Sequence, residues 1–326
     1  MKIKFIHFVK TIIVIIFAIS IVMLSFVSTN FKSLLNTLNS NYDGTSLSTS
    51  NDWQSTQTYT NSFVWIGHAT VLLNMDGENF LFDPVFSDRA SPFTFIGPKR
   101  LMKPAIPINN LPRISKVLIS HNHYDHLDIN SLKALQEINQ GIEFFVPKGD
   151  RELLAKHNLK NIKEFEWWET ANSDNKVIKF IPVKHWSARS FFDKNKSLWG
   201  GWQIKNKQYS IVHFGDTAYD ERFLVNKEKI GNVDIGFIPI GSYAPRDIEK
   251  ENHVNPQEAI QIAKDLNISY SYGIHWGTFF LSKEPLYEPA KLIDKYQDPF
   301  SGRIFSTTEP GKIIYLDSLK YQSIVR

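Results

Sequence analysis

A histidine-rich loop places the strongest constraint on this chain. A short apolar stretch at residues 117–119 is typical of a buried strand, and it runs directly into Ser-His-Asn-His-Tyr-Asp-His. In this pattern His121 and His123 can turn to one metal ion, while Asp125 and His126 turn to a second. Imidazole nitrogens and a carboxylate oxygen suit zinc or a similar divalent ion. A polar turn with chance histidines is the alternative, but the chain has only 10 histidines in all.

The composition restricts how a metal can be held and which partners are needed. The chain of 326 residues has no cysteine, so it offers neither disulfides nor thiolate ligands, and any metal must be bound by histidine and aspartate. The absence of cysteine also fits export to an oxidising compartment. The formal net charge of +4 is not concentrated in blocks of like charge. We therefore expect no nucleic acid as a partner.

The N-terminal residues differ from the rest of the chain. Lys2, Lys4 and Lys10 precede an almost wholly apolar stretch at residues 11–27. Its length reaches the lower limit for spanning a bilayer, about 17 residues, and no good small-x-small cleavage motif follows it. We expect a membrane anchor at residues 1–28, with a cleaved signal segment as the alternative. The preceding lysines favour a cytoplasmic N-terminus, which puts the folded domain outside the cytoplasm, on the periplasmic or extracellular face.

A tether and one large domain are expected after this apolar span. Residues 29–60 are rich in Ser, Thr and Asn and have little apolar periodicity, which is typical of a tether. Ordered structure should begin near Phe63, so the domain is expected at residues 61–326. Its first strands are joined by a hairpin turn at Asp76-Gly77. They are expected at residues 63–66, 71–74 and 80–82.

The rest of the domain alternates strands with a few helices. A proline-rich loop at residues 92–112 is long enough to form a lid, with a surface connection of no special role as the alternative. Helices are expected at residues 130–139, 150–157 and 256–266, and the last begins with the capping sequence Asn255-Pro256-Gln257-Glu258. Further strands are expected at residues 142–146, 162–165, 177–183, 198–204, 209–214, 234–240, 269–274 and 312–316. Two strand-rich halves that each carry helices favour an α/β sandwich of two sheets flanked by helices.

Three more acidic or imidazole residues follow expected strands. They are His185, Asp216 and His275. Rigid strands fix the loops at their ends, and an α/β scaffold commonly places its ligands there. Taken singly, His185 would more often be a packed or surface histidine, and Asp216 could be a turn residue. Their shared placement with the histidine-rich loop makes all three candidate ligands.

These residues and several short motifs resemble the metallo-β-lactamase superfamily, and within it the N-acylphosphatidylethanolamine-hydrolysing phospholipase D branch. The resemblance covers the chain in order from about residue 63 to about residue 280. It implies an αβ/βα four-layer sandwich with its metal site at the edge between two sheets. The motifs are Trp65-Ile66-Gly67-His68-Ala69-Thr70, Asp83-Pro84-Val85-Phe86-Ser87, Gly97-Pro98-Lys99-Arg100, residues 120–128, His185-Trp186, Leu198-Trp199-Gly200, Phe214-Gly215-Asp216-Thr217, Ile238-Pro239-Ile240-Gly241 and Ile274-His275-Trp276-Gly277-Thr278.

The resemblance also implies two zinc ions per chain and a division of roles. The implied ligands are His121, His123 and His185 for the first ion, Asp125, His126 and His275 for the second, and Asp216 as a bridge. A pair of ions can share a hydroxide, lower its pKa and hold a phosphate. The implied catalytic residues are Asp125, Asp216 and His253, and the expected substrate contacts are Tyr124, Arg189 and His253. For His253, a simple loop histidine is the alternative.

The implied activity is that of a zinc-dependent phosphodiesterase. A metal-bridging hydroxide would hydrolyse a phospholipid to phosphatidic acid and an N-acylethanolamine, at a membrane reached through the N-terminal span. The resemblance does not cover that span, so a lipid-binding groove in the domain does not follow. A hydrolase with the same metal core and a soluble lactone or cyclic phosphate as substrate is a second hypothesis. A tethered binding protein is a third, but a closed structural zinc site has four protein ligands, often thiolates, which the ligands here do not match.

Overall fold

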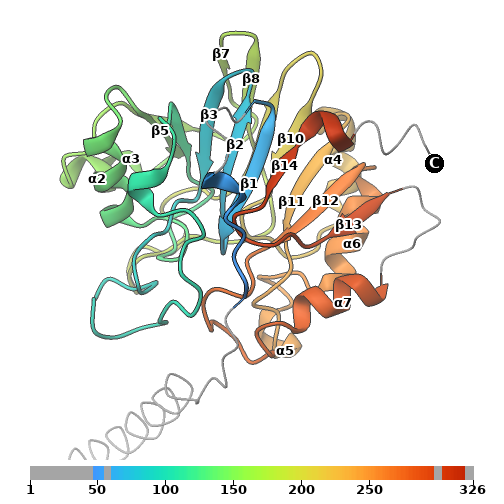
Figure 1. Ribbon diagram of the computed structural model, residues 1–326. Helices are drawn as coiled ribbons and strands as arrows, with labels where there is room; N and C mark the ends of the chain where they lie inside the picture. Colours follow the sequence, from blue (N-terminus) through green and yellow to red (C-terminus); the bar gives the residue numbers. More distant parts are fainter. Residues whose placement is uncertain (1–46, 55–59, 297–302, 320–326) are drawn as a thin grey trace, which may run out of the picture. The chain divides into compact units, whose positions relative to one another are not determined.

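The computed structural model describes residues 47–54, 60–296 and 303–319 (Figure 1). The chain divides into two compact units, Met1–Thr45 and Ser46–Arg326, and every described residue belongs to the second. The anchor predicted at residues 1–28 therefore lies outside the described residues, as does most of the predicted tether. No helix in the described ranges is long and apolar enough to cross a membrane.

The first sheet has seven strands in the order β14-β1-β2-β3-β4-β5-β6. The strands are β1 (Ser62–Gly67), β2 (Thr70–Met75), β3 (Glu78–Phe82), β4 (Lys116–Leu118), β5 (Glu143–Pro147), β6 (Ile162–Phe165) and β14 (Ile313–Tyr315). Antiparallel pairing joins β14, β1, β2 and β3, and parallel pairing continues from β3 to β6. The predicted hairpin turn is confirmed, because Asp76 and Gly77 join β2 to β3 with positive φ angles of 51° and 77°.

The second sheet also has seven strands, in the order β13-β12-β11-β10-β9-β8-β7. The strands are β7 (Thr170–Ser173), β8 (Lys176–Ile181), β9 (Gly201–Lys205), β10 (Ser210–His213), β11 (Ile235–Pro239), β12 (Tyr270–Ile274) and β13 (Ile304–Ser306). Strands β7 to β10 are antiparallel neighbours, and β10 to β13 are parallel. Both sheets are therefore mixed.

The alternation of side chains along β1 separates two cores. Phe63 and Trp65 belong to the core that contains residues of both sheets, and the Phe63 ring lies 4.9 Å from that of Phe237 on β11. Val64 and Ile66 belong to a second core on the opposite face of the first sheet. Successive side chains of a strand point to opposite faces, so β1 is buried on both.

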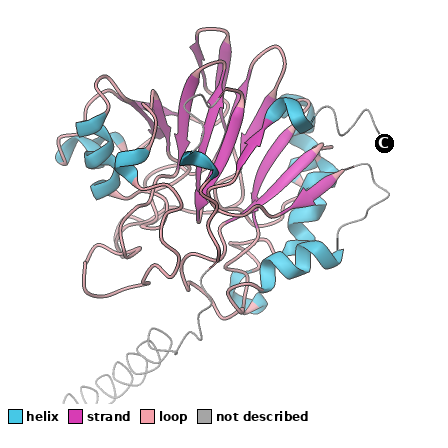
Figure 2. Ribbon diagram, in the orientation of Figure 1, coloured by secondary structure: helices cyan, strands magenta, loops and turns pink. Residues whose placement is uncertain are grey.

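Helices cover the outer faces of the two sheets (Figures 1 and 2). α2 (Ile129–Ile138) and α3 (Arg151–Lys156) contribute leucines to the outer core of the first sheet, and α4 (Arg222–Ile230), α6 (Pro256–Asp265) and α7 (Glu288–Tyr296) pack beside the second. Three shorter helices are α5 (Arg246–Glu249), η1 (Asp52–Gln54) and η2 (Ile108–Asn110). The capping sequence predicted for α6 is confirmed, because the Asn255 side chain accepts from Glu258 N (2.9 Å) and the Glu258 side chain accepts from Asn255 N (3.1 Å). The layers form the predicted αβ/βα sandwich.

Two boundaries differ from the sequence-based expectation. The strand expected at residues 198–204 begins only at Gly201, because the N–H groups of Leu198 and Gly200 donate to carbonyls of Lys148 and Ser120, in loops of the first sheet. In addition, residues 47–54, within the expected tether, already lie against the domain. Ser50 N donates to Pro310 O (2.8 Å), and Trp53 packs against the outer core of the first sheet.

Candidate metal centre

The predicted ligands follow the ends of four strands and meet at one edge of the sandwich. The histidine-rich loop follows β4, His185 follows β8, Asp216 follows β10 and His275 follows β12. Strands β8, β10 and β12 run in the same direction, because β9 is antiparallel to both β8 and β10, while β10, β11 and β12 are parallel. Their ends therefore lie at one edge, as expected for ligand-bearing loops.

The three ligands predicted for the first ion lie together. The nitrogens of His121, His123 and His185 are within 4.8 Å of one another. His123 Nδ1 lies 2.8 Å from His121 Nε2 and 3.3 Å from His185 Nε2. The other ring nitrogen of His185, Nδ1, donates to Asn252 O at 2.9 Å. This bond fixes the ring and leaves Nε2 directed at the other two histidines.

The ligands predicted for the second ion also converge, and an additional histidine joins them. Asp125 Oδ2 lies 3.3 Å from His275 Nε2 and 3.6 Å from His126 Nε2. The same oxygen lies 3.0 Å from Nε2 of His68, which sequence reasoning quoted in a motif but gave no role. These four side chains form one group that could hold a metal ion.

Asp216 lies between the two sets of ligands. Its Oδ2 is 3.1 Å from both His126 Nε2 and His275 Nε2. It is 3.9 Å from His121 Nε2 and 3.8 Å from His185 Nε2, which belong to the first set. A single carboxylate that reaches both sets has the placement expected of a bridge.

Asp83 and Ser120 form hydrogen bonds with the Nδ1 atoms of two predicted ligands, His126 and His121. Asp83 Oδ2 accepts from His126 Nδ1 (2.8 Å) and from Ser120 Oγ (2.7 Å), and Ser120 Oγ lies 2.9 Å from His121 Nδ1. This contact of Nδ1 with Asp83 fixes the His126 ring so that Nε2 faces Asp216. Sequence reasoning missed this role, although Asp83 directly follows an apolar strand, as the predicted ligands do.

Burial and mutual charge set the protonation of the cluster. Burial lowers the pKa of His123 and of His253 to about 3, so both imidazoles are neutral near pH 7. Although burial opposes it, the carboxylates of Asp216 and Asp125 raise the pKa of His275 to about 9. Against the effect of burial, neighbouring histidines hold the pKa values of both carboxylates well below their usual range. Ionised carboxylates and neutral imidazoles are the forms that bind metal, so His275 must release a proton when an ion binds.

The residues present fit a metal ion. Buried polar atoms are normally hydrogen-bonded, yet several atoms of this cluster have no such partner within the described part of the chain. They are His68 Nδ1, His123 Nε2, Asp216 Oδ1, His253 Nδ1 and His275 Nδ1. Imidazole nitrogens and carboxylate oxygens, without thiolates, suit a divalent cation such as zinc, although they do not select one metal.

The three expected substrate contacts have different surroundings. His253 Nδ1 lies 3.8 Å from Asp216 Oδ2, and its ring centroid is 5.1 Å from that of His185, so it belongs to the cluster. Tyr124 OH donates to Arg189 O at 3.0 Å, and the Arg189 guanidinium lies 3.8 Å from the centroid of the Tyr124 ring. Arg189 Nη1 also donates to two backbone carbonyls of the histidine-rich loop, those of Asn122 and Leu127, both at 2.8 Å. Arg189 thus braces the loop, and its contact with substrate stays a prediction.

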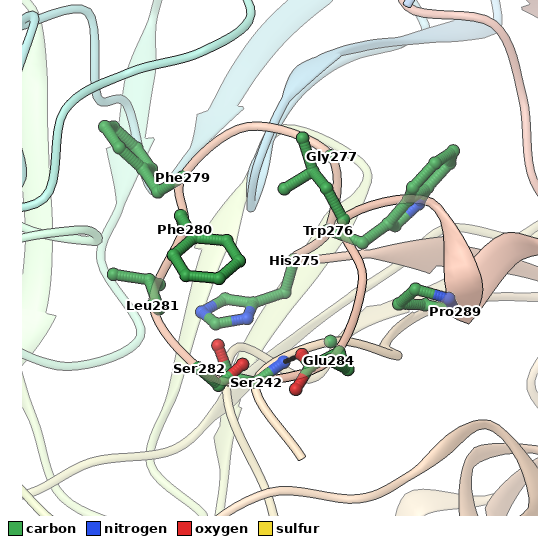
Figure 3. Close-up of a pocket in the computed structure, with 12 residues that line it drawn as sticks. Ser242, His275, Trp276, Gly277, Phe279, Phe280, Leu281, Ser282, Glu284 and Pro289 are labelled. Atoms are coloured by element: carbon green, nitrogen blue, oxygen red, sulfur yellow. Dashed lines mark hydrogen bonds between the residues drawn. The ribbon is translucent and has the colours of Figure 1, made fainter. Parts of the chain in front are cut away.

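A small pocket opens beside His275 (Figure 3). Its apolar wall includes Phe279, Phe280 and Leu281, and its polar part includes Ser282 and Glu284. The Glu284 carboxylate accepts from the backbone N–H groups of residues 242 and 244, at 2.6 and 3.0 Å. The pocket therefore presents both apolar side chains and fixed polar groups beside His275.

Known proteins resemble this chain in sequence. The family described as "Beta-lactamase superfamily domain" matches residues 78–276. N-acyl-phosphatidylethanolamine-hydrolyzing phospholipase D 1 of Caenorhabditis elegans is 35% identical over 264 residues, which cover 76% of this chain and 74% of the nematode protein. The mitochondrial N-acyl-phosphatidylethanolamine-hydrolyzing phospholipase D of Saccharomyces cerevisiae is 36% identical over 237 residues, which cover 71% of this chain but only 50% of the yeast protein.

Solved structures resemble it in fold. Igni18, a metallo hydrolase from the archaeon Ignicoccus hospitalis, has a TM-score of 0.58 at 18% identity, covering 78% of this chain and 97% of that protein. CmlA, a diiron β-hydroxylase from Streptomyces venezuelae, has a TM-score of 0.60 at 21% identity, covering 80% of this chain and 55% of that protein. At these identities the likeness concerns the fold alone. With its sandwich fold and its His/Asp cluster, the chain belongs to the metallo-β-lactamase superfamily of metallo-hydrolases, and N-acyl-phosphatidylethanolamine-hydrolysing phospholipases D are among its homologues.

Proposed function

We propose that this protein is a zinc-dependent phosphodiesterase that hydrolyses an N-acylphosphatidylethanolamine to phosphatidic acid and an N-acylethanolamine. The observation that carries the proposal is the position of Asp216 Oδ2, within 4 Å of ring nitrogens from both sets of predicted ligands. The names of the nematode and yeast homologues support the choice of substrate.

Each residue of the cluster has a separate task in this proposal. His121, His123 and His185 hold one zinc ion, Asp125, His126 and His275 hold the other, and Asp216 contacts both. When bound, two such ions lower the pKa of water and balance negative charge on phosphate oxygens. Asp83 and Ser120 keep His126 and His121 in the orientation that presents Nε2.

His253 is assigned to the phosphate or the leaving group. Its Nδ1 has no hydrogen-bond partner within the described residues and lies 3.8 Å from Asp216 Oδ2. Its side chain is more exposed than that of Asp216, 14% against 2%, so it is reachable from outside the cluster. A neutral imidazole in this place can orient the phosphate or exchange a proton with the departing alcohol oxygen.

Exposed phenylalanines on two loops support a lipid substrate. Phe191 and Phe192 are 101% and 84% exposed, and they closely follow Arg189, which contacts the histidine-rich loop. Phe93 and Phe95 are 54% and 78% exposed on the proline-rich loop. Large aromatic side chains in water are unfavourable, and such residues are enriched where proteins meet the lipid interface. The predicted N-terminal anchor would add a second membrane attachment, with the domain outside the cytoplasm.

Hydrolysis in water labelled with heavy oxygen tests the proposal. The full chain is loaded with zinc and given N-acylphosphatidylethanolamine, and mass spectrometry follows the label. Because cleavage at phosphorus adds solvent oxygen to the phosphate, the label should enter phosphatidic acid and not the N-acylethanolamine. Label in a free fatty acid would mean cleavage of an ester or amide. Turnover of a lactone or cyclic phosphate without turnover of any phospholipid would move the assignment to a soluble substrate.

A further inference from the structure

We propose that His68 is a positioning residue for the second metal subsite, where its Nε2–H holds the carboxylate of Asp125. The proposal rests on the metal centre of the proposed function and adds a residue that neither the sequence motifs nor the homologues assign a role. Three imidazoles approach Asp125 Oδ2, those of His68, His126 and His275, and only His68 lies outside the predicted ligand set.

The direction of the hydrogen bond follows from its partners. His68 Nε2 lies 3.0 Å from Asp125 Oδ2, closer than either predicted ligand. An ionised carboxylate can only accept, so the imidazole nitrogen is the donor. The bond holds one oxygen of Asp125 in place. Partners of this kind orient metal-binding carboxylates and are commonly as necessary as the ligands themselves.

The backbone of His68 is held in an uncommon conformation. Its φ of 53° is left-handed, which is uncommon for any residue other than glycine and persists where the surroundings enforce it. Three bonds do so here: His68 N donates to Thr278 Oγ1 (2.7 Å), and His68 O accepts from Trp65 Nε1 (2.8 Å) and from His275 N (2.9 Å). Backbone strain of this kind gathers at functional sites.

His68 also contacts a second predicted ligand. His275 has a left-handed φ of 63°, its backbone N–H donates to His68 O, and the two ring centroids are 4.0 Å apart. His68 therefore touches Asp125 through its side chain and His275 through both backbone and ring. One side-chain atom of His68 lies within 4.8 Å of a ligand atom from each of Asp125, His126 and His275. His68 forms no such group with the predicted ligands of the first ion, His121, His123 and His185.

Direct binding of the ion by His68 is the competing role. His68 is near enough to join Asp125, His126 and His275 around one ion. However, these three and Asp216 already supply four protein atoms, and a catalytic zinc needs a position open to water or substrate. A fifth protein ligand would close that position, and Asp125 would lose its nearest donor.

The test uses the full chain with zinc and cobalt as probes, and stepwise competition with a chelator gives the affinity of each ion. His68→Gly removes the ring while relieving the left-handed backbone, so any loss belongs to the ring. We expect this variant to lower the affinity for the second ion by about 10- to 100-fold, the usual cost of losing a residue that orients a metal ligand. The affinity for the first ion should not change. His68→Gln has an amide N–H that can reach the position of Nε2, so it should retain most of the second-ion affinity.

Thr278→Val is the matched control. It removes the acceptor of His68 N but leaves the ring in place, so it should lower the temperature of unfolding without changing either metal affinity. Equal loss of the second ion in this control and in His68→Gly would make the loop, and not the ring, responsible. Wild-type affinity in His68→Gly would also overturn the proposal. His68→Asn tolerates the left-handed conformation but is too short to reach Asp125, so it gives the same comparison if the glycine variant does not fold.

The cobalt spectrum separates positioning from direct binding. If His68 only positions Asp125, His68→Gln saturated with cobalt should keep the wild-type visible absorption. Loss or shift of the bands would mean a changed set of ligands and would contradict the proposal. If the wild-type protein itself binds a single ion, the proposed dinuclear function fails first, and the role of His68 falls with it.

Discussion

The two ends of strands β3, β4 and β8 carry buried polar clusters that are built in opposite ways. At the starts of these strands lies the lysine–glutamate cluster, Glu78, Lys116 and Lys176. Glu78 Oε1 is 2.6 Å from Lys116 Nζ, and Glu78 Oε2 is 3.3 Å from Lys176 Nζ. Beyond the other ends lies the histidine–aspartate cluster, which comprises the predicted metal ligands with His68, Asp83 and His253.

The two clusters differ in whether protein atoms alone pair all of their charged and hydrogen-bonding groups. In the lysine–glutamate cluster, opposite charges face each other, and Ser173 Oγ contacts both Glu78 oxygens at 2.8 and 3.0 Å. In the histidine–aspartate cluster, imidazoles surround three carboxylates, and several ring nitrogens and one carboxylate oxygen have no hydrogen-bond partner among the described residues. Buried polar groups are stable only when paired. The first cluster is complete with protein atoms alone, whereas the second needs cations, and variants of each should respond accordingly.

The largest expected effect is that of Asp216→Ala on metal content and activity. Asp216 is the predicted ligand that reaches both sets, so its loss should lower the content of both ions. Metal ions supply several kcal/mol of transition-state stabilisation, so activity should fall by about 10³-fold or more. Elemental analysis and steady-state kinetics measure the two effects. Asp220→Ala, in the same loop region but paired with Arg222, is the control. Wild-type metal content in Asp216→Ala would contradict the assignment.

Lys176→Met should affect folding stability and leave metal binding unchanged. Its ammonium is almost fully buried, and its loss leaves Glu78 with Lys116 as its remaining cation, so the cost should be about 1.5–3 kcal/mol, the value of a hydrogen bond to a charged group. Urea unfolding of the metal-free protein measures the loss. Lys148→Met breaks an exposed pair with Glu166 and should cost little. A fall in metal content that accompanies the loss of stability would show that the two clusters are not independent.

Asp83→Asn should weaken metal binding without abolishing it. Asp83 contacts no ion in this account but orients His126 directly and His121 through Ser120. Loss of such a partner typically lowers metal affinity by about 10- to 100-fold. Chelator competition measures the affinity. Asp128→Asn removes another buried carboxylate, one that caps α2 and binds Ser131, and it should change stability more than affinity. If Asp128→Asn weakened metal binding more than Asp83→Asn did, Asp83 would have only a structural role.

The smallest effect concerns acid stability at the lysine–glutamate cluster. Although burial acts against it, the hydrogen bond from the Lys116 ammonium lowers the pKa of Glu78 below its usual value of 4.5. A lowered carboxylate pKa contributes stability that is present above the unfolded-state pKa and is lost as the pH falls through the folded-state pKa. The stability difference between the wild type and Glu78→Gln should therefore be constant near neutral pH and shrink below about pH 4.5. A difference independent of pH would contradict this assignment.

Local sequence patterns selected candidate ligands that the structure brings together, and the limits of these patterns are visible in particular residues. His121, His185, Asp216 and His275 each follow an apolar strand, so parallel strand ends were enough to bring them together. The role of His68 depends instead on a shift in the register of the β1–β2 pairing, between Trp65 and Gly67. It also depends on the contact with Asp125, which lies 57 residues further along the chain. Neither can be read from a short pattern.

The same limit applies to the elements that sequence analysis missed. β7 is the polar stretch Thr-Ala-Asn-Ser, which pairs with β8 at the edge of its sheet, and a four-residue strand without apolar alternation gives no local signal. Lys176 follows Asp174 and Asn175 in a turn and would be expected in water. It is buried because Glu78, from the first sheet, compensates its charge. Helices α4, α5 and α7 were also missed, and α4 and α7 are partly stabilised by packing beside the second sheet.

The number of metal ions per chain tests the central claim most directly. The full chain is saturated with zinc, freed of loosely bound metal by gel filtration and measured by elemental analysis together with protein concentration. Two sets of three ligands with Asp216 between them exceed what one tetrahedral ion can use, so the account predicts about two ions per chain. A stoichiometry that remains near one after saturation would contradict it.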